Sequence, residues 1–553
     1  MTAPTAATAI VAGLRAHGAD RLFCVAGESY LPVLDALHDE PGIDVVTCRH
    51  EGSAGFAALA DAKLTGRPGI CAVSRGPGAA NAAIAVHAAA EDGAPLLLLV
   101  GGVPLARTER EPFQGLDCAR FFGGFAKAVW TLHDPANAGE LVARAVRTAT
   151  AGTPGPVVLV LPEDVLAQPV GEPARLVPGA AGRVPARAAV PVEVLAEVRR
   201  LLCRAERPLI IAGAAVDSAE GRTLLRRAAE RHDIPVVTAN KRQHLLANRH
   251  PQYAGHLSNS VPRSQLDALA RADLILAVGT RLDNTTTAGR RLPGRQPLVH
   301  VHPDAQRIGT YHPVAAGCAA DPAGFLAELA GWERTGDPHG RAAWSAELHG
   351  IEAAQAVWHP VAAGDGVVFG AVVAALDELT GGDATVVVDS GTFTAWVYRH
   401  LRFGARGRLV GISSSAMGFG PGAGVAAALR PNGGPTVVVV GDGGLVMNPG
   451  ELATACERQL DITYIVANNA SYGTIRVHQE RHYPGRTIAT DLANPDFAVL
   501  AESFGALGLT AGHPDEIRAY LAKALRHPGP AVLEVRTSLE HVSPSRRLNG
   551  TPS

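Results

Sequence analysis

The sequence predicts an α/β protein built from three doubly wound domains, each around a parallel sheet. Short apolar runs recur along the 553 residues, and each is bounded by Gly, Pro or Asp and followed by a helix-like stretch rich in Ala and Leu. The runs are continuous rather than alternating, which is typical of strands buried on both faces of a parallel sheet. A chain of this length is too long for one hydrophobic core, and the runs fall into three groups.

The three groups define the predicted strands and domains. The strands are expected at 21–27, 69–76, 94–102 and 155–164, then at 207–215, 233–240, 272–281 and 296–304, and finally at 383–391, 408–415, 435–444, 461–469 and 530–537. The corresponding domains are expected at 1–168, 190–332 and 360–540. The stretches 167–191 and roughly 332–364 are rich in Pro, Gly, Ala or charge, and we interpret them as linkers.

Composition and charge exclude several classes of partner. The chain has 50 basic and 52 acidic residues, so no field of one sign would attract nucleic acid. No apolar run approaches the roughly 18 to 20 residues of a membrane-spanning helix. Residues 1–20 resemble an amphipathic helix rather than a signal peptide, so we expect a cytoplasmic protein. Its seven cysteines form no C-x-x-C pair, which favours reduced thiols over disulfides or zinc ligands.

Two polar motifs follow predicted strands of the third group. Gly441, Asp442 and Gly443 end one strand, and Asn468 and Asn469 end the next. Carboxyl ends of parallel strands share one edge of the sheet, where ligands bind, so Asp442 and Asn469 can face one ion. Carboxylate and amide oxygens suit Mg²⁺, which commonly bridges a protein to a diphosphate. Either motif alone could simply form a turn, but together they favour the ion.

This pair of motifs resembles the diphosphate anchor of thiamine-diphosphate enzymes. The resemblance extends from about residue 5 to 540, and it implies pyrimidine-binding, central and diphosphate-binding domains in that order. It also implies that Asp442, Asn469 and the backbone carbonyl of Ser471 hold Mg²⁺, while Gly441 and Gly443 let the backbone approach the diphosphate.

An acid in the first domain has a counterpart in the same family. Glu51 follows a predicted strand and begins a helix of small residues. The family's acid at this place hydrogen-bonds to a ring nitrogen of the cofactor and favours the imine tautomer that removes the thiazolium proton. Outside this context, a lone His-Glu pair would more often be an exposed start of a helix.

The segment 413–424 contains a glycine pattern that invites comparison with dinucleotide-binding turns. A serine-rich stretch precedes it instead of an apolar strand, so we do not favour that interpretation. In the thiamine family the equivalent stretch carries a large apolar residue that bends the cofactor, and Met417 fits this role. The backbone carbonyl of Ser415 would then meet the exocyclic amine.

Further resemblance is to acetolactate synthases. Residues 109–130 match a pattern in which Phe and Gln enter the active centre and a Lys follows, and the counterparts are Phe113, Gln114 and Lys127. Ordinary packing is an equally good explanation for all three. Glu28 stands where some decarboxylases of the family carry an acid, so it could shuttle protons or simply cap a helix.

Several charged side chains have two interpretations. Arg75 could supply a cation to a substrate carboxylate, or it could pair structurally with Glu91 or another acid. Arg476, His478 and His482 could cover the acceptor pocket or belong to a solvated loop.

The sequence of the middle domain leaves open whether the protein binds FAD. Residues 278–284 and 299–309 are similar to the stretch that holds FAD in biosynthetic synthases. His302 replaces the usual acid there, and residues 256–260 depart from the pattern as well. If FAD binds, the resemblance implies a structural role.

The resemblance implies decarboxylation of a 2-oxo acid followed by carboligation to an aldehyde or a second oxo acid, as in acetolactate synthases. A 2-oxo acid decarboxylase or lyase of the same family is the alternative, and a non-catalytic nucleotide-binding regulatory protein is the rival from a different class. In the family one cofactor bridges the first domain of one chain and the third domain of its partner, so a homodimer or homotetramer is expected.

Overall fold

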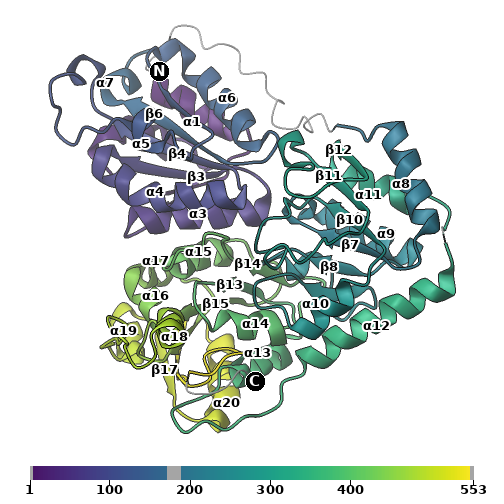
Figure 1. Cartoon of the computed structure of the whole chain (residues 1–553). Helices are drawn as coiled ribbons and strands as arrows, with labels where there is room; N and C mark the ends of the chain where they lie inside the picture. Colours follow the sequence, from purple (N-terminus) through teal and green to yellow (C-terminus); the bar gives the residue numbers. More distant parts are fainter. Residues whose placement is uncertain (1–3, 171–187, 335, 549–553) are drawn as a thin grey trace.

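Three α/β units make up the computed structural model, which describes residues 4–170, 188–334 and 336–548 (Figure 1). Each unit has a six-stranded sheet in which all the paired strands run parallel, with helices on both faces. The predicted fold class is therefore confirmed. Most of the predicted linker at 167–191 lies outside the described residues.

The N-terminal unit has the strand order β2-β1-β3-β4-β6-β5. Its strands are β1 Arg21–Cys24, β2 Asp44–Thr47, β3 Gly69–Ser74, β4 Leu96–Gly102, β5 Ala128–Thr131 and β6 Pro156–Pro162. Its helices are α1 Ala6–Ala16, α2 Leu31–His38, α3 Glu51–Thr65, α4 Arg75–Asp92, α5 Cys118–Phe122, α6 Ala138–Thr150 and α7 Glu163–Leu166. The N-terminal helix is thus present, and the side chain of its N-cap, Thr5, accepts a bond from the Thr8 amide.

The central unit has the order β12-β11-β10-β7-β8-β9. Its strands are β7 Pro208–Ala212, β8 Val236–Thr238, β9 Tyr253–His256, β10 Leu274–Val278, β11 Leu298–His302 and β12 Ala316–Ala319. Its helices are α8 Val192–Arg204, α9 Ala219–His232, α10 Arg263–Leu269, α11 Pro322–Gly331 and α12 Pro338–Ala356.

Helix α12 overturns the prediction of a linker at 332–364. Asp337 caps the helix by accepting amide bonds from His339 and Gly340. Arg341 is almost fully buried and donates to the carbonyls of Leu202, Ala205 and His232, while Trp344 donates to Pro208. The helix therefore packs along the central unit (Figure 1). Its buried face is small, which is why the apolar pattern was weak.

The C-terminal unit has the order β14-β13-β15-β16-β18-β17. Its strands are β13 Thr385–Val388, β14 Arg408–Val410, β15 Thr436–Gly441, β16 Ile462–Asn468, β17 Leu507–Ala511 and β18 Ala531–Arg536. Its helices are α13 Gly370–Thr380, α14 Thr394–His400, α15 Phe419–Ala428, α16 Asp442–Met447, α17 Glu451–Glu457, α18 Gly473–His482, α19 Phe497–Phe504 and α20 Pro514–Arg526.

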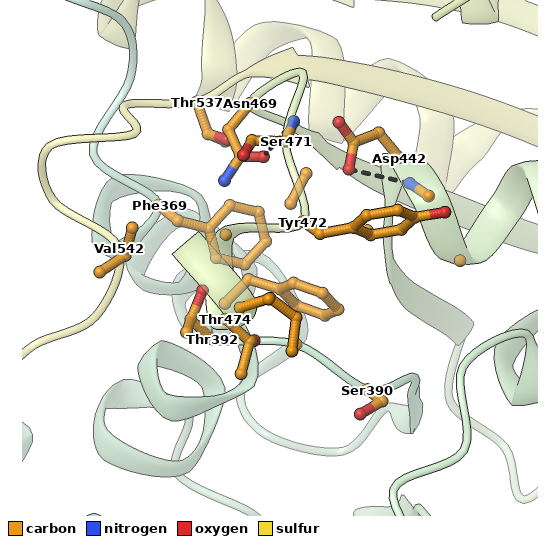
Figure 2. A pocket seen from close by; sticks show the side chains of 18 of the residues that line it. Phe369, Ser390, Thr392, Asp442, Asn469, Ser471, Tyr472, Thr474, Thr537 and Val542 are labelled. Atoms are coloured by element: carbon orange, nitrogen blue, oxygen red, sulfur yellow. Dashed lines mark hydrogen bonds between the residues drawn. The ribbon is translucent and has the colours of Figure 1, made fainter. Parts of the chain in front are cut away.

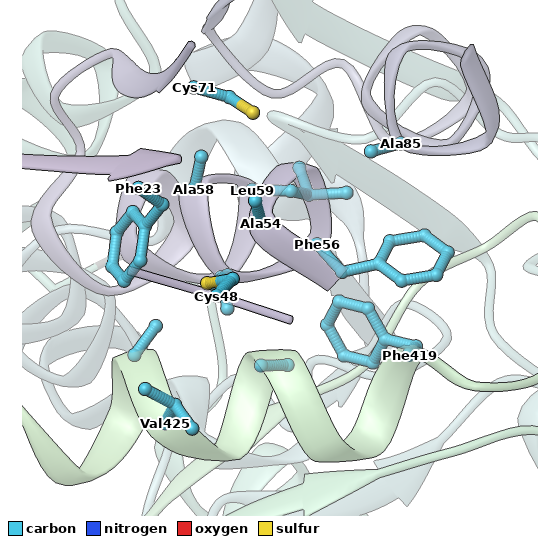
Figure 3. Packing of buried hydrophobic residues seen from close by; sticks show 14 of the residues in the cluster. Phe23, Cys48, Ala54, Phe56, Ala58, Leu59, Cys71, Ala85, Phe419 and Val425 are labelled. Carbon is cyan, nitrogen blue, oxygen red and sulfur yellow. The ribbon is translucent and has the colours of Figure 1, made fainter. Parts of the chain in front are cut away.

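Helices α3 and α15 join the N-terminal and C-terminal units through one apolar core (Figure 3). The rings of Phe56 and Phe419 meet edge to face with centroids 5.5 Å apart. A Cβ on Gly422 would lie 2.5 Å from the carbonyl oxygen of Ser53, so only glycine allows this close approach. Within the residues that the structure describes, no helix combines the length and apolarity needed to cross a membrane.

Candidate active site

The carboxyl ends of β15 and β16 lie side by side because Gly441 pairs with Ala467 in register. Asp442 and Asn469 therefore leave adjacent strands at the same edge of the sheet. Both line a cavity of about 340 Å³ (Figure 2). Its described lining comes entirely from residues 369–542 and includes Ser415, Met417, Gly441, Gly443 and Ser471.

Asp442 is held as a buried carboxylate at the start of α16. Its Oδ1 accepts the Gly443 amide at 2.9 Å, and its Oδ2 accepts the Asn494 side chain at 2.8 Å. Burial raises the pKa of Asp442, while these donors act in the opposite direction. The Asn494 amide also donates to Asn468, 3.0 Å away. Asn494 was absent from the sequence prediction because it lies beyond β16 in a segment without regular structure.

The turn after β16 brings further oxygens into the cavity. The Asn469 side chain accepts the Ser471 amide at 3.1 Å, and the Ser471 hydroxyl donates to the Thr490 carbonyl at 2.9 Å. Ala470 adopts a φ of 51°, which turns the chain between them. The Ser471 hydroxyl therefore already has a hydrogen-bond partner within the protein.

These groups fit a hard divalent ion. Among the described residues, no cluster of three or more His, Cys, Asp or Glu side chains could hold a metal. A site at Asp442 would therefore combine one carboxylate with amide and carbonyl oxygens, the donor set that suits Mg²⁺. A Cβ on Gly443 would lie 2.6 Å from the Tyr472 ring, so a residue without a side chain is needed for this ring to pack there.

The glycine-rich segment before α15 is occupied by the protein's own carboxylate. Asp389 is buried and accepts the amides of Gly418 and Gly420, each at 3.1 Å. Burial raises the pKa of Asp389 to about 6. Since a dinucleotide phosphate would need these same amides, the geometry disfavours a dinucleotide site at this turn.

Glu51 lies at the carboxyl edge of the N-terminal sheet, as the first residue of α3. Asn81 of α4 donates to its carboxylate at 2.9 Å. The neighbouring His50 caps the helix by accepting the Gly52 amide. Glu51 is not part of the described lining of the cavity at Asp442 in its own chain.

Other predicted residues share this edge. The Gln114 carbonyl accepts the amide of Gly76, which lies in the first turn of α4, and Gln114 has a φ of 59°. Phe113 is 76% exposed, so packing within its own chain does not explain its ring. Glu28 is exposed and begins a single 3₁₀ turn after β1, with Gly27 at the N-cap position.

Lys127, a candidate catalytic residue because a Lys follows Phe and Gln in the matched pattern, lies at the other edge of the sheet from Phe113 and Gln114 in its own chain. It precedes β5, and its amide bonds to Pro156, the first residue of β6. Its ammonium donates to the carbonyls of Ala151 and Thr153 at 2.6 and 2.9 Å. The spacing of the motif matches the synthase pattern. However, Lys127 lies just before the start of β5, and the carboxyl end of that strand, not its start, lies at the edge of the sheet where Glu51 is found.

The remaining charged candidates have partners. Arg75 donates to Glu163 at 2.8 Å, which is the structural pairing with another acid. Arg476 of α18 pairs with Asp491. The rings of His478 and His482 stack on α18 with centroids 6.4 Å apart, and both residues are exposed.

In the central sheet, His302 is buried at the end of β11 and accepts the Asp304 amide at 3.1 Å. Burial lowers the pKa of His302 to about 4, so the ring is neutral at physiological pH. A neutral imidazole therefore stands where the synthase pattern has an acid.

Comparison with known proteins agrees with this architecture. Three family models match in sequence: thiamine pyrophosphate enzyme, N-terminal TPP binding domain, over residues 4–120, the central domain over 195–329, and the C-terminal TPP binding domain over 389–535. The acetolactate synthase large subunit of Parasynechococcus marenigrum is 32% identical across 96% of this chain and 87% of its own length. The chain belongs to the thiamine pyrophosphate enzyme family.

Two further relatives are similar to this chain over nearly its whole length. The putative thiamine pyrophosphate-containing protein YdaP of Bacillus subtilis is 29% identical over 100% of this chain and 94% of its own. The acetolactate synthase isozyme 2 large subunit of Escherichia coli is 28% identical over 97% and 96%. The three sheets thus coincide with the three domains of this enzyme family, and the family's cofactor is thiamine diphosphate.

Proposed function

We propose that this thiamine-diphosphate enzyme decarboxylates a 2-oxo acid and joins the remaining fragment to a second carbonyl compound. The observation that carries the proposal is the pairing of Asp442 and Asn469 in one cavity at the carboxyl edge of the sheet. The names of two relatives, both acetolactate synthases, support carboligation as the outcome.

The residues of the cavity would hold the cofactor through Mg²⁺. Asp442, Asn469 and the Ser471 carbonyl are the proposed metal ligands, and Asn494 orients the carboxylate. The glycine backbone at Gly441 and Gly443 would lie against the diphosphate, and Met417 and the Ser415 carbonyl are proposed to contact the rest of the cofactor from the same cavity. When bound, thiamine diphosphate supplies a thiazolium that accepts the electron pair released as carbon dioxide leaves.

Glu51 would place a proton at the pyrimidine ring nitrogen. Because the described lining of the cavity contains no residue before 369, the Glu51 that serves it is proposed to come from a second copy of the chain. A two-fold homodimer, alone or within a tetramer, would then contain two equivalent sites.

Phe113 and Gln114 are proposed to contact the second substrate. The exposure of Phe113 in the single chain supports this, since an uncovered ring beside Glu51's sheet edge is available to a partner's cavity. Lys127 is omitted because of its position. Glu28, at the same edge, is the feature that would instead suit a simple decarboxylase, in which a carboxyl group protonates the product.

FAD is left outside the proposal, and so is nucleotide binding at the glycine-rich turn. The first remains a prediction from resemblance, with the neutral His302 against it. The second is disfavoured by Asp389, which occupies the turn's amides.

The decisive experiment incubates the protein, thiamine diphosphate and Mg²⁺ with a panel of 2-oxo acids, with and without aldehydes, and identifies the products by mass. Carbon dioxide with a ligated product supports carboligation, and an aldehyde alone supports the decarboxylase. Asp442→Ala is the matched control. Nucleotide binding without turnover of any 2-oxo acid would contradict the enzyme assignment.

A further inference from the structure

A single peptide group, Ile412–Ser413, precedes the cavity-lining residues Ser415 and Met417 and is held by two other domains. The amide of Ser413 donates to the Asp92 carboxylate at 2.7 Å, and Asp92 ends α4 in the N-terminal unit. The carbonyl of Ile412, the other half of the same peptide, accepts a bond from the Lys241 ammonium of the central unit. Both polar groups of one peptide are therefore bound by charged side chains that belong to different domains.

The charged groups around this peptide are buried. The side chain of Asp92 is 1% exposed and pairs with Lys63 of α3. Lys241 is 7% exposed and follows β8 with a φ of 57°. Burial lowers the pKa of Lys241 to about 8, with Asp92 and Asp389 opposing the shift. Buried charges are costly unless they are paired, so this arrangement is specific to the groups that it holds.

The clamped peptide leads directly into the cavity wall. The Ile412 carbonyl also accepts the amide of Ser415, and Ser415 has a φ of 53°. At the other end of the segment, Asp389 and Asn448 fix Gly418 through its amide and its carbonyl. Ser415 and Met417, which line the cavity, lie between these two fixed points.

Other contacts at the junction of the central and C-terminal units have a different form. Arg402 reaches the Asn248 carbonyl and the Glu352 carboxylate, 3.0 Å away, and it lies outside the described lining of the cavity. Such contacts join the units without touching the segment 412–418. Domain attachment alone would therefore not require that Asp92 and Lys241 share one peptide.

We propose that Asp92 and Lys241 are positioning residues that set the place of Ser415 and Met417 against the cofactor. This inference rests on the proposed function, because it assigns the segment 412–418 to the cofactor's site. Neither residue touches the cavity, and each acts through the Ile412–Ser413 peptide. The geometry of the site is thereby coupled to how the other two domains pack.

The test compares Lys241→Met, which keeps most of the length of the side chain but removes the donor, with Arg402→Met as a control at the same junction. Hydrogen exchange is measured for the peptide that contains Ser413, and thiamine diphosphate binding is measured by calorimetry with Mg²⁺. Lys241→Met should speed exchange and weaken cofactor binding by about tenfold each, the lower range expected for one hydrogen bond to a charged group.

Arg402→Met should leave both quantities within about twofold while lowering the melting temperature. If Lys241→Met lowers the melting temperature similarly but changes neither exchange nor binding, the positioning role is wrong and Lys241 only joins the domains. If Lys241→Met does not fold, Asp92→Asn takes its place in the comparison with Arg402→Met. Failure of the wild type to bind thiamine diphosphate would refute the proposed function instead, and the exchange measurement would still decide whether the clamp exists.

Discussion

The side chain of Asn81 donates a 2.9 Å hydrogen bond to the carboxylate of Glu51. Asn81 belongs to α4 and Glu51 begins α3, so the contact ties the acid to the helix beside it. One carboxylate oxygen is thereby occupied and the direction of the other is restricted, which would suit the role proposed for Glu51 toward a single ring nitrogen.

Replacement of Glu51 by Gln should separate binding from catalysis. The amide keeps the size of the side chain but cannot shuttle a proton, so the rate of carbon dioxide release should fall by about 10²- to 10⁴-fold. Cofactor affinity, measured by calorimetry, should change little. Asn81→Ala is the companion variant, and its rate of carbon dioxide release should fall by less than that of Glu51→Gln. Turnover near that of the wild type in Glu51→Gln would remove this residue from the mechanism.

Asp442→Ala removes the charged ligand of the proposed metal. Cofactor affinity should fall by at least about a hundredfold, and excess Mg²⁺ should restore little of it. Asn494→Ala removes the partner that orients Asp442, together with the bond to Asn468, and should lower cofactor affinity by about 10- to 100-fold. Calorimetry at several Mg²⁺ concentrations measures both variants. Equal affinities in Asp442→Ala and wild type would refute the metal assignment.

Two inactive variants should complement each other if the site spans two chains. Coexpressed Glu51→Gln and Asp442→Ala chains would form heterodimers with one intact site and one doubly damaged site. Random pairing makes half of the dimers mixed, so activity should return to about a quarter of the wild-type value. Differential affinity tags confirm the mixed dimers. Complete inactivity of purified heterodimers would argue for sites built within one chain.

The contact between Asp20 and Arg430 should make stability sensitive to acid. Hydrogen bonds from Arg430 and Arg67 hold the pKa of Asp20 well below its ordinary value, against a partial desolvation. A lowered pKa in the folded state stabilises the protein above the unfolded-state pKa of 3.8, and this stabilisation is lost as the pH falls below it.

Asp20→Asn should therefore cost about 1 kcal/mol at pH 7, a value kept small because the pair is partly exposed to solvent. Urea unfolding should show the same difference from wild type down to about pH 4.5 and a smaller one below about pH 4. A difference that grows on acidification would contradict the assignment.

Gly422→Ala should force α3 and α15 apart. The new Cβ would lie 2.5 Å from the Ser53 carbonyl oxygen, so we expect a loss of about 1 to 3 kcal/mol from overpacking. Gly350→Ala is the matched control, because that helical glycine is exposed and a Cβ added there would have nothing within 4 Å; it should be neutral or stabilising. Thermal unfolding compares the two. Equal melting temperatures would mean that the helices can move apart freely.

The strands that sequence reasoning missed share one position in the fold. All five, β2, β5, β9, β12 and β17, are edge strands of their sheets. Interior strands are covered on both faces and have neighbours on both sides, so they appear as unbroken apolar runs. An edge strand such as β5, Ala128–Thr131, is only partly buried and lacks that pattern.

Among the site residues, those fixed by strand ends were predictable and those fixed by tertiary contacts were not. Asp442 and Asn469 follow adjacent parallel strands, so the topology alone brings them together. Asn494 and Asp389 act through hydrogen bonds to side chains and amides distant in sequence, and no local pattern marks them. Lys127 is singled out because its motif matches a known pattern, but the motif does not indicate at which edge of the sheet Lys127 lies.

Helix α12 decides where the polypeptide can be divided. Since Arg341 reaches carbonyls at the ends of α8 and α9 and Trp344 joins the core of the central unit, cutting the chain before Pro338 would expose part of that core and leave main-chain acceptors unsatisfied. Chimeras that exchange the C-terminal module between relatives should therefore be joined after Ala356. A graft made at residue 332 would replace the recipient's α12 by the donor's, which would then have to pack on a central module from another protein.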